Sequence, residues 1–98
     1  MDLSPLIDRM RATFADIERQ MSDPEFYTDR ERSQTVGREH QRLLGFLSTY
    51  DELESCRSQL ADNHELQQSE EDPELLEMVS ADIADLEDRI EKLDLKVM

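Results

Sequence analysis

Apolar residues recur at alternating spacings of four and three near the start of the chain: Leu3, Ile7, Met10, Phe14, Ile17 and Met21. This alternation places all of the side chains on one stripe of an α-helix. Ser4 can cap such a helix, and Pro5 suits its first position because proline has no N–H to leave unpaired. The pattern predicts a helix over about residues 4–22.

The stretch MSDPEFYTDRE, residues 21–31, interrupts this repeat with two successive helix-start signals: Ser22-x-x-Glu25 and Thr28-x-x-Glu31. Pro24 cannot extend the helix before it, so the stretch predicts a turn between antiparallel neighbours. We expect the Thr28 hydroxyl to accept the backbone N–H of Glu31, and the Glu31 carboxylate to accept that of Thr28. Two aromatic residues are expected to fold this connection onto the helices: Phe26 and Tyr27.

A second helix is predicted from about residue 29 to residue 63, on a broader set of apolar positions: Val36, Leu43, Leu44, Phe46, Leu47, Tyr50, Leu53 and Leu60. A wide stripe suits a helix that is contacted on two sides. Gly37 and Gly45 lie eight residues apart, on nearly the same face. They are either tolerated weak points of about 1 kcal/mol each or sites where a neighbouring backbone approaches closely.

A polar break, ADNHELQQSEEDPE, precedes the third periodic segment. Asp72 is a good helix cap and Pro73 a good first residue, and the acidic residues that follow complement the helix dipole. The next apolar residues keep a strict three-four alternation: Leu76, Val79, Ile83, Leu86, Ile90, Leu93 and Val97. This segment predicts a helix over residues 73–97.

Together the three segments predict an all-α fold, an elongated antiparallel three-helix coiled-coil bundle that forms one domain over residues 1–98. At about 1.5 Å per residue the helices span roughly 28, 50 and 38 Å. The outer two helices therefore overlap only partly along the middle one. We expect two helices side by side toward the ends of the bundle and three near its centre. The last helical pattern runs to Met98 without a cap, so we expect an N-terminal fragment of a longer protein.

Charge is distributed unevenly over a chain of net charge −14. Residues 1–49 carry nine acidic and seven basic residues, whereas residues 50–98 carry sixteen and four. The second half should repel nucleic acid and anionic membranes, so a basic protein surface is the more suitable partner. An acidic mimic of nucleic acid is an alternative that a solvated helix face makes unnecessary. With no membrane span or signal sequence in view, we expect a cytoplasmic protein.

Residues with chemical potential are few and scattered. The single cysteine, Cys56, excludes an internal disulfide, and the two histidines, His40 and His64, are too far apart on one helix to share a metal. The acidic run Glu70-Glu71-Asp72 lacks the spaced ligands and glycine of a calcium loop. We therefore expect no catalytic, cofactor or metal site and no enzymatic activity, and structural roles for the cysteine and the histidines.

One basic concentration interrupts the acidic background: Arg30, Arg32, Arg38 and Arg42. Arg38 and Arg42 share a helix face and could contact phosphates or an acidic partner. Glu31 and Glu39 are interleaved with them, so a solvated ion-pair face is the favoured interpretation. The sequence singles out no partner-binding residue.

In order and spacing, these motifs resemble the N-terminal domain of bacterial class-I peptide chain release factors over essentially the whole chain. In that family an SDP turn follows the first helix, here Ser22-Asp23-Pro24. A KEHxxL-like sequence follows, here GREHQRL (residues 37–43), and the third helix begins with a DPE motif, here DPELLEM (residues 72–78). DPELLEM and the closing LDLKVM are more similar to release factor one, the reader of UAA and UAG, than to its UGA-reading relative.

The resemblance implies a part in translation termination. It places the domain near the base of the ribosomal stalk, in contact with a basic ribosomal protein there and with an influence on the GTPase that recycles the factor. Stop-codon reading and Gly-Gly-Gln-dependent hydrolysis of peptidyl-tRNA would lie outside this domain. The alternative function is a generic acidic coiled-coil adaptor for protein–protein interaction. A homodimer of the isolated chain is compatible with both functions.

Overall fold

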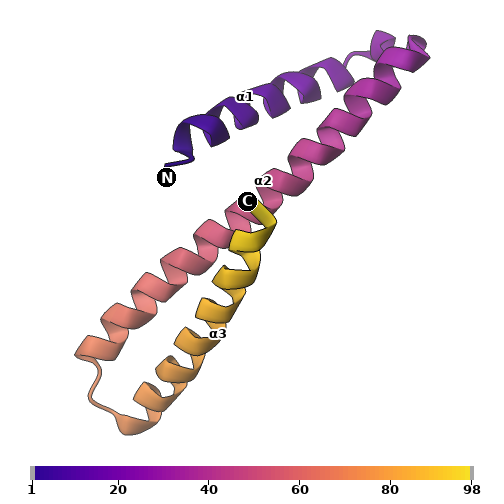
Figure 1. Ribbon diagram of the computed structural model, residues 1–98. Helices are drawn as coiled ribbons and strands as arrows, with labels where there is room; N and C mark the ends of the chain where they lie inside the picture. Colours follow the sequence, from indigo (N-terminus) through magenta and orange to yellow (C-terminus); the bar gives the residue numbers. More distant parts are fainter. Residues whose placement is uncertain (1, 98) are drawn as a thin grey trace. The chain divides into compact units, whose positions relative to one another are not determined.

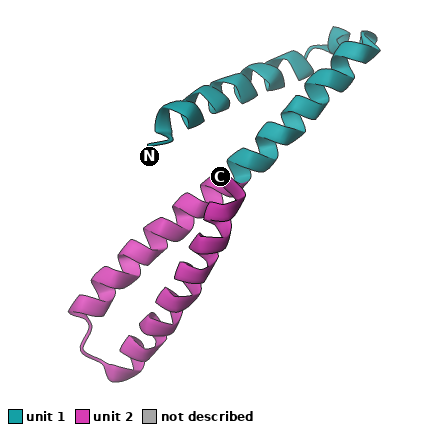
Figure 2. Ribbon diagram, viewed as in Figure 1, with its two compact units in different colours: residues 1–48 teal, residues 49–98 magenta. Residues whose placement is uncertain are grey.

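The computed structural model describes residues 2–97, which form three α-helices and one short 3₁₀ helix (Figure 1). The elements are α1 (Ser4–Met21), η1 (Pro24–Thr28), α2 (Arg30–Ser69) and α3 (Pro73–Val97). No strand occurs over this range, so the predicted all-α class is confirmed. The chain divides into two compact units, residues 1–48 and 49–98, and α2 contributes to both (Figure 2). The elongated bundle with three helices side by side at its centre stays a prediction.

Unit 1, residues 1–48, is a helical hairpin in which α1 runs antiparallel to the first part of α2 (Figure 1). All six residues of the predicted α1 stripe are buried or half-buried, since their spacing keeps them on one face. The core of the unit draws on both helices and on the connection: Ile7, Ile17, Phe26, Leu43 and Leu47.

Unit 2, residues 49–98, is a second hairpin, formed by the rest of α2 and by α3. Its core is a cluster of Leu53, Cys56, Leu86 and Leu93, against which Leu60, Ile90 and Val97 pack. All seven residues of the predicted α3 stripe are buried or half-buried. Cys56 belongs to this core because it continues the three-four spacing between Leu53 and Leu60.

The start of α2 differs from the prediction. Asp29, not Thr28, caps the helix: the Asp29 side chain accepts the backbone N–H of Arg32 at 3.0 Å, and its backbone is extended. The Thr28 hydroxyl instead donates to the Glu25 carbonyl at 2.7 Å and closes η1. The predicted Thr28–Glu31 capping box is therefore wrong, because Thr28 already belongs to the preceding helical turn.

The start of α1 also differs in its capping residue. Ser4 is the first residue of the helix, and its backbone N–H donates to the Asp2 side chain at 2.9 Å. This hydrogen bond lowers the pKa of the Asp2 carboxyl, because it favours the ionised form. The predicted Ser4 cap is therefore wrong, since Leu3 occupies the capping position without a side-chain hydrogen bond. Ser22, predicted to start a helix, instead ends α1, because its hydroxyl donates to the Glu18 and Arg19 carbonyls.

Three further details separate the structure from the expectations. α2 continues to Ser69, six residues past its predicted end. A Cβ added at Gly37 or Gly45 would meet no described atom within 4 Å, so the close backbone approach is wrong and the two glycines are weak points only. Phe26 is 3% exposed and alone fills the connection, whereas Tyr27 is 62% exposed and meets the Phe26 ring edge-on.

Among the described residues, no helix has the length and apolar character that a membrane crossing demands.

Candidate protein-interaction surfaces

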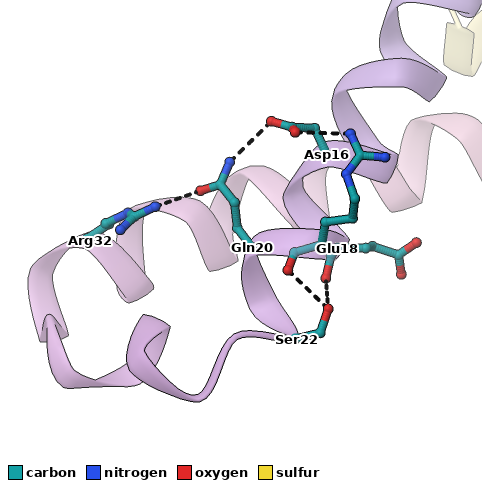
Figure 3. Close-up of polar contacts among 6 residues, drawn as sticks. Asp16, Glu18, Gln20, Ser22 and Arg32 are labelled. Carbon is teal, nitrogen blue, oxygen red and sulfur yellow. Dashed lines mark hydrogen bonds and ion pairs between the residues drawn. The ribbon is translucent and has the colours of Figure 1, made fainter.

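The corner between α1 and α2 is held by a chain of polar contacts within unit 1 (Figure 3). The Gln20 amide donates to Asp16 at 3.2 Å and accepts from Arg32 at 3.1 Å, while Arg19 pairs with Asp16 at 3.1 Å. Arg32 also lies over the Phe26 ring, 5.9 Å from its centroid. Of these contacts, the Gln20–Arg32 hydrogen bond joins α1 to α2, whereas the Arg19–Asp16 pair lies within α1.

A cavity of about 440 Å³ opens at this corner. Two arginines line it together with three acidic side chains: Asp23, Glu25 and Asp29. The arginines already have the partners described above, and the acidic side chains outnumber them. The cavity therefore presents no net positive charge to an anion.

His40 takes part in packing between α1 and α2. Its ring stacks on Phe14 with centroids 4.7 Å apart, and its Nε2 lies 3.5 Å from the Glu18 carboxylate. His64 is exposed and belongs to unit 2. Residues 2–97 contain no group of three or more His, Cys, Asp or Glu side chains placed to hold a metal.

The four arginines singled out in the sequence do not act together. Arg42 forms a two-pronged contact with Glu39, at 3.1 and 2.6 Å, and its hydrogen bonds lower the pKa of the Glu39 carboxyl. Arg32 is engaged at the corner, and Arg30 and Arg38 are exposed. The Arg42–Glu39 pair is typical of a solvated ion-pair face, whereas Arg32 contacts a neutral amide and an aromatic ring.

Unit 2 carries its charge differently, since two arginines bridge its helices. Arg57 contacts Asp94 at 2.9 Å and Arg89 contacts Glu52 at 3.2 Å. Between these two arginines, residues 58–88 contain eleven acidic residues and no lysine or arginine. The far end of the hairpin is therefore strongly negative.

The acidic run at the α2–α3 connection has a structural task. The Glu70 carboxylate accepts the backbone N–H groups of Glu71 and Asp72, each at 3.1 Å. Asp72 accepts the backbone N–H of Glu74 at 3.0 Å, in the capping position predicted for it. These carboxylates satisfy donors of the turn and of the first turn of α3.

Large apolar side chains are exposed at the same end of the hairpin. Leu66 is 42% exposed, Leu75 44% and Met78 63%. We call these three residues the tip patch. All three lie outside the apolar stripes that face the core, so the three-four spacing does not predict them. The signal available was a large apolar residue that lies off its helix's stripe.

A second cavity shows on which side of each helix these residues lie. It has a volume of about 420 Å³ and is lined from α2 by Gln59 and Asn63 and from α3 by Asp82, Asp85 and Arg89 among others. Leu66 continues the α2 row three residues after Asn63. Leu75 and Met78 continue the α3 row, seven and four residues before Asp82. Helical spacing thus places the tip patch on the side of the hairpin that bears this cavity.

Register determines how far apart the two parts of the tip patch lie along the hairpin. The Gln67 amide donates to the Ser80 hydroxyl at 3.3 Å across the hairpin. Leu66 is the neighbour of Gln67, and Met78 lies two residues before Ser80. In this register Met78 lies about one helical turn from the level of Leu66, and Leu75 lies about one turn further toward the α2–α3 connection.

Comparison with known proteins finds one family and a set of similar chains. Residues 10–98 match the PCRF domain family. The chain is 39% identical over 93 residues to peptide chain release factor 1 of Akkermansia muciniphila, covering 95% of this chain and 26% of that protein. It is 32% identical to the release factor 1 of Chlorobaculum tepidum, over 90% of this chain and 25% of that protein.

Similarity extends to peptide chain release factor 2 of Acidithiobacillus ferrooxidans, at 29% identity over 94% of this chain and 25% of that protein. The chain thus spans about a quarter of the length of the curated relatives that it matches. No solved structure gives a significant match.

Proposed function

The chain belongs to the PCRF domain family, and from this membership we propose that it acts in translation termination as the N-terminal accessory domain of a peptide chain release factor. The observation that carries the proposal is similarity to release factors 1 along 90–95% of the chain. Release factor one is the favoured type, because its representatives reach 39% identity, against 29% for the release factor 2 from Acidithiobacillus.

In this proposal the chain performs no catalysis of its own. Its 98 residues contain no Gly-Gly-Gln sequence, the element that release factors use to promote peptidyl-tRNA hydrolysis. Stop-codon reading and hydrolysis belong to other parts of the factor. The chain acts in the cytoplasm, where the ribosome lies, and contributes a docking surface.

The docking partner in this proposal is a basic ribosomal protein at the stalk base. Support comes from the charge of unit 2, which contains sixteen acidic residues and four basic ones. A negatively charged surface attracts lysine and arginine and repels phosphate. Contact with the GTPase that recycles the factor is a further part of the proposal and follows from the resemblance alone.

A release assay and a binding assay test the proposal together. Ribosomes carrying formyl-methionyl-tRNA with a stop codon in the decoding site should release no formyl-methionine when the 98-residue chain is added alone. The chain should cosediment with intact ribosomes, and less so with ribosomes stripped of the stalk-base protein. Release by the chain alone would contradict the accessory role, and equal binding to stripped ribosomes would contradict the stalk-base contact.

Sedimentation of the chain without ribosomes tests the adaptor alternative. Strong self-association, combined with no binding to ribosomes, would favour a coiled-coil adaptor over a release-factor domain.

A further inference from the structure

The tip patch of unit 2 is an unusual combination of exposed apolar surface and uniform charge. Isolated exposed leucines are normal on soluble proteins and need no explanation. Here three large apolar side chains lie within about two helical turns along the side of the hairpin that bears the 420 Å³ cavity. Met78, the most exposed of them, is also the most adaptable, because an unbranched thioether can fit an irregular partner surface.

The surroundings of the tip patch restrict what can cover it. Eleven acidic residues and no lysine or arginine occur in residues 58–88, the segment that contains the patch. Glu74 and Glu77 adjoin Leu75 and Met78 in sequence, and Asp82 lies one turn further along the same row. These carboxylates would repel the phosphates of a nucleic acid that approached the patch, and they would attract lysine and arginine side chains.

We propose that the tip patch docks onto a basic protein surface that presents an apolar side chain between its lysine and arginine residues. The apolar contact supplies the centre of the interface, and the acidic residues supply its rim and its selectivity. This inference rests on the proposed function for the place where the partner is found, the ribosome. It goes beyond that function by naming the residues and the chemistry of the contact.

Binding of the labelled 98-residue chain to 70S ribosomes tests the inference directly. The double variant Leu75→Ser/Met78→Ser removes the centre of the patch, and we expect its affinity to fall by about tenfold or more. Leu95→Ser is the matched control, because Leu95 is an exposed leucine of the same helix outside the patch, and its affinity should change less than about twofold. All of these side chains are exposed, so circular dichroism melting should be alike for the variants.

Two substitutions that each remove one negative charge test the acidic rim of the patch separately. Glu77→Gln should weaken binding and reduce its dependence on salt concentration, because one attractive pair is lost. Asp8→Asn removes an exposed carboxylate from α1 in unit 1 and should change neither. Equal effects of the two substitutions would indicate attraction by overall charge and would contradict a specific contact.

A photo-crosslinker in place of Met78 identifies the class of partner. A covalent adduct with a basic ribosomal protein is the expected result, and an adduct with ribosomal RNA would overturn the inference. If the unmodified chain binds and the double variant binds as tightly, the inference fails while the proposed function stands. If the unmodified chain does not bind ribosomes, the proposed docking fails and the inference falls with it.

Discussion

The two units build the same element, an antiparallel helical hairpin, by different means. Unit 1 combines short apolar stripes with one buried aromatic ring at its corner and with polar contacts between the helices, such as Gln20–Arg32 and His40–Glu18. Unit 2 uses a regular three-four repeat and places two ion pairs across its seam. Unit 1 has a net charge of −2 and unit 2 of −12.

This difference shows what each unit leaves available for a partner. Unit 1 uses some of its polar side chains in contacts between its own helices. A hairpin that closes through apolar contacts and two bridging arginines can keep most of its carboxylates unneutralised. The regular core of unit 2 thus permits the acidic surface on which we propose docking.

The largest expected effect tests the dependence of unit 1 on its corner. Phe26→Ala should lower the free energy of unfolding by about 3–5 kcal/mol, because it removes a large aromatic side chain that is 3% exposed. Tyr27→Ala is the matched control, since this neighbouring ring is mostly exposed, and it should cost far less. Urea denaturation followed by circular dichroism measures both. Equal losses would show that the corner needs both rings.

The second effect tests the apolar seam of unit 2. Leu86→Ala should lower the free energy of unfolding by about 2–5 kcal/mol through lost burial and a residual cavity. Leu95→Ala, an exposed site on the same helix, should stay within about 0.5 kcal/mol of the unchanged chain. A small loss for Leu86→Ala in the same urea experiment would mean that the seam repacks and is less specific than its spacing suggests.

The third effect concerns the helix start that differs from the sequence prediction. Asp29→Ala should cost about 1 kcal/mol, because the Arg32 backbone N–H loses its acceptor. Thr28→Ala should cost less, since the Thr28 hydroxyl donates to a carbonyl of η1 and caps no helix. Thermal melting ranks the two variants, and the reverse order would restore Thr28 as the cap.

The smallest effect has the opposite sign. Gly37→Ala and Gly45→Ala should each stabilise the chain by about 0.4–1 kcal/mol, because alanine restricts the unfolded chain and described atoms leave room for its Cβ. Both sites lie in unit 1, so they would sharpen the contrast by strengthening the less regular hairpin. A fall in melting temperature would mean that one of the glycines has a close neighbour after all.

The sequence allowed the periodic parts of this molecule to be predicted and left the irregular parts open. Every α3 stripe residue from Leu76 to Val97 is buried or half-buried, because strict spacing determines which face is apolar. The cap of α2 was misassigned because Thr28 and Asp29 are adjacent and both are good caps. Only the three-dimensional turn of η1 decides between them.

The end of α2 and the tip patch show the same limit. The apolar repeat fades after Leu60, yet the helix continues to Ser69 on polar residues that a pattern search treats as loop. Cross-hairpin pairs such as Arg57–Asp94 depend on the register between helices, which spacing along one helix does not contain. The tip patch depends on that same register, so it emerged only from the structure.

The Cys56 thiol is 1% exposed and lies in the core between α2 and α3. Its reactivity can therefore report how often these helices separate. A maleimide reagent reaches this sulfur only during an opening, so the rate of alkylation reports how often the hairpin parts. The same seal hinders two copies of the chain from joining through a disulfide in air.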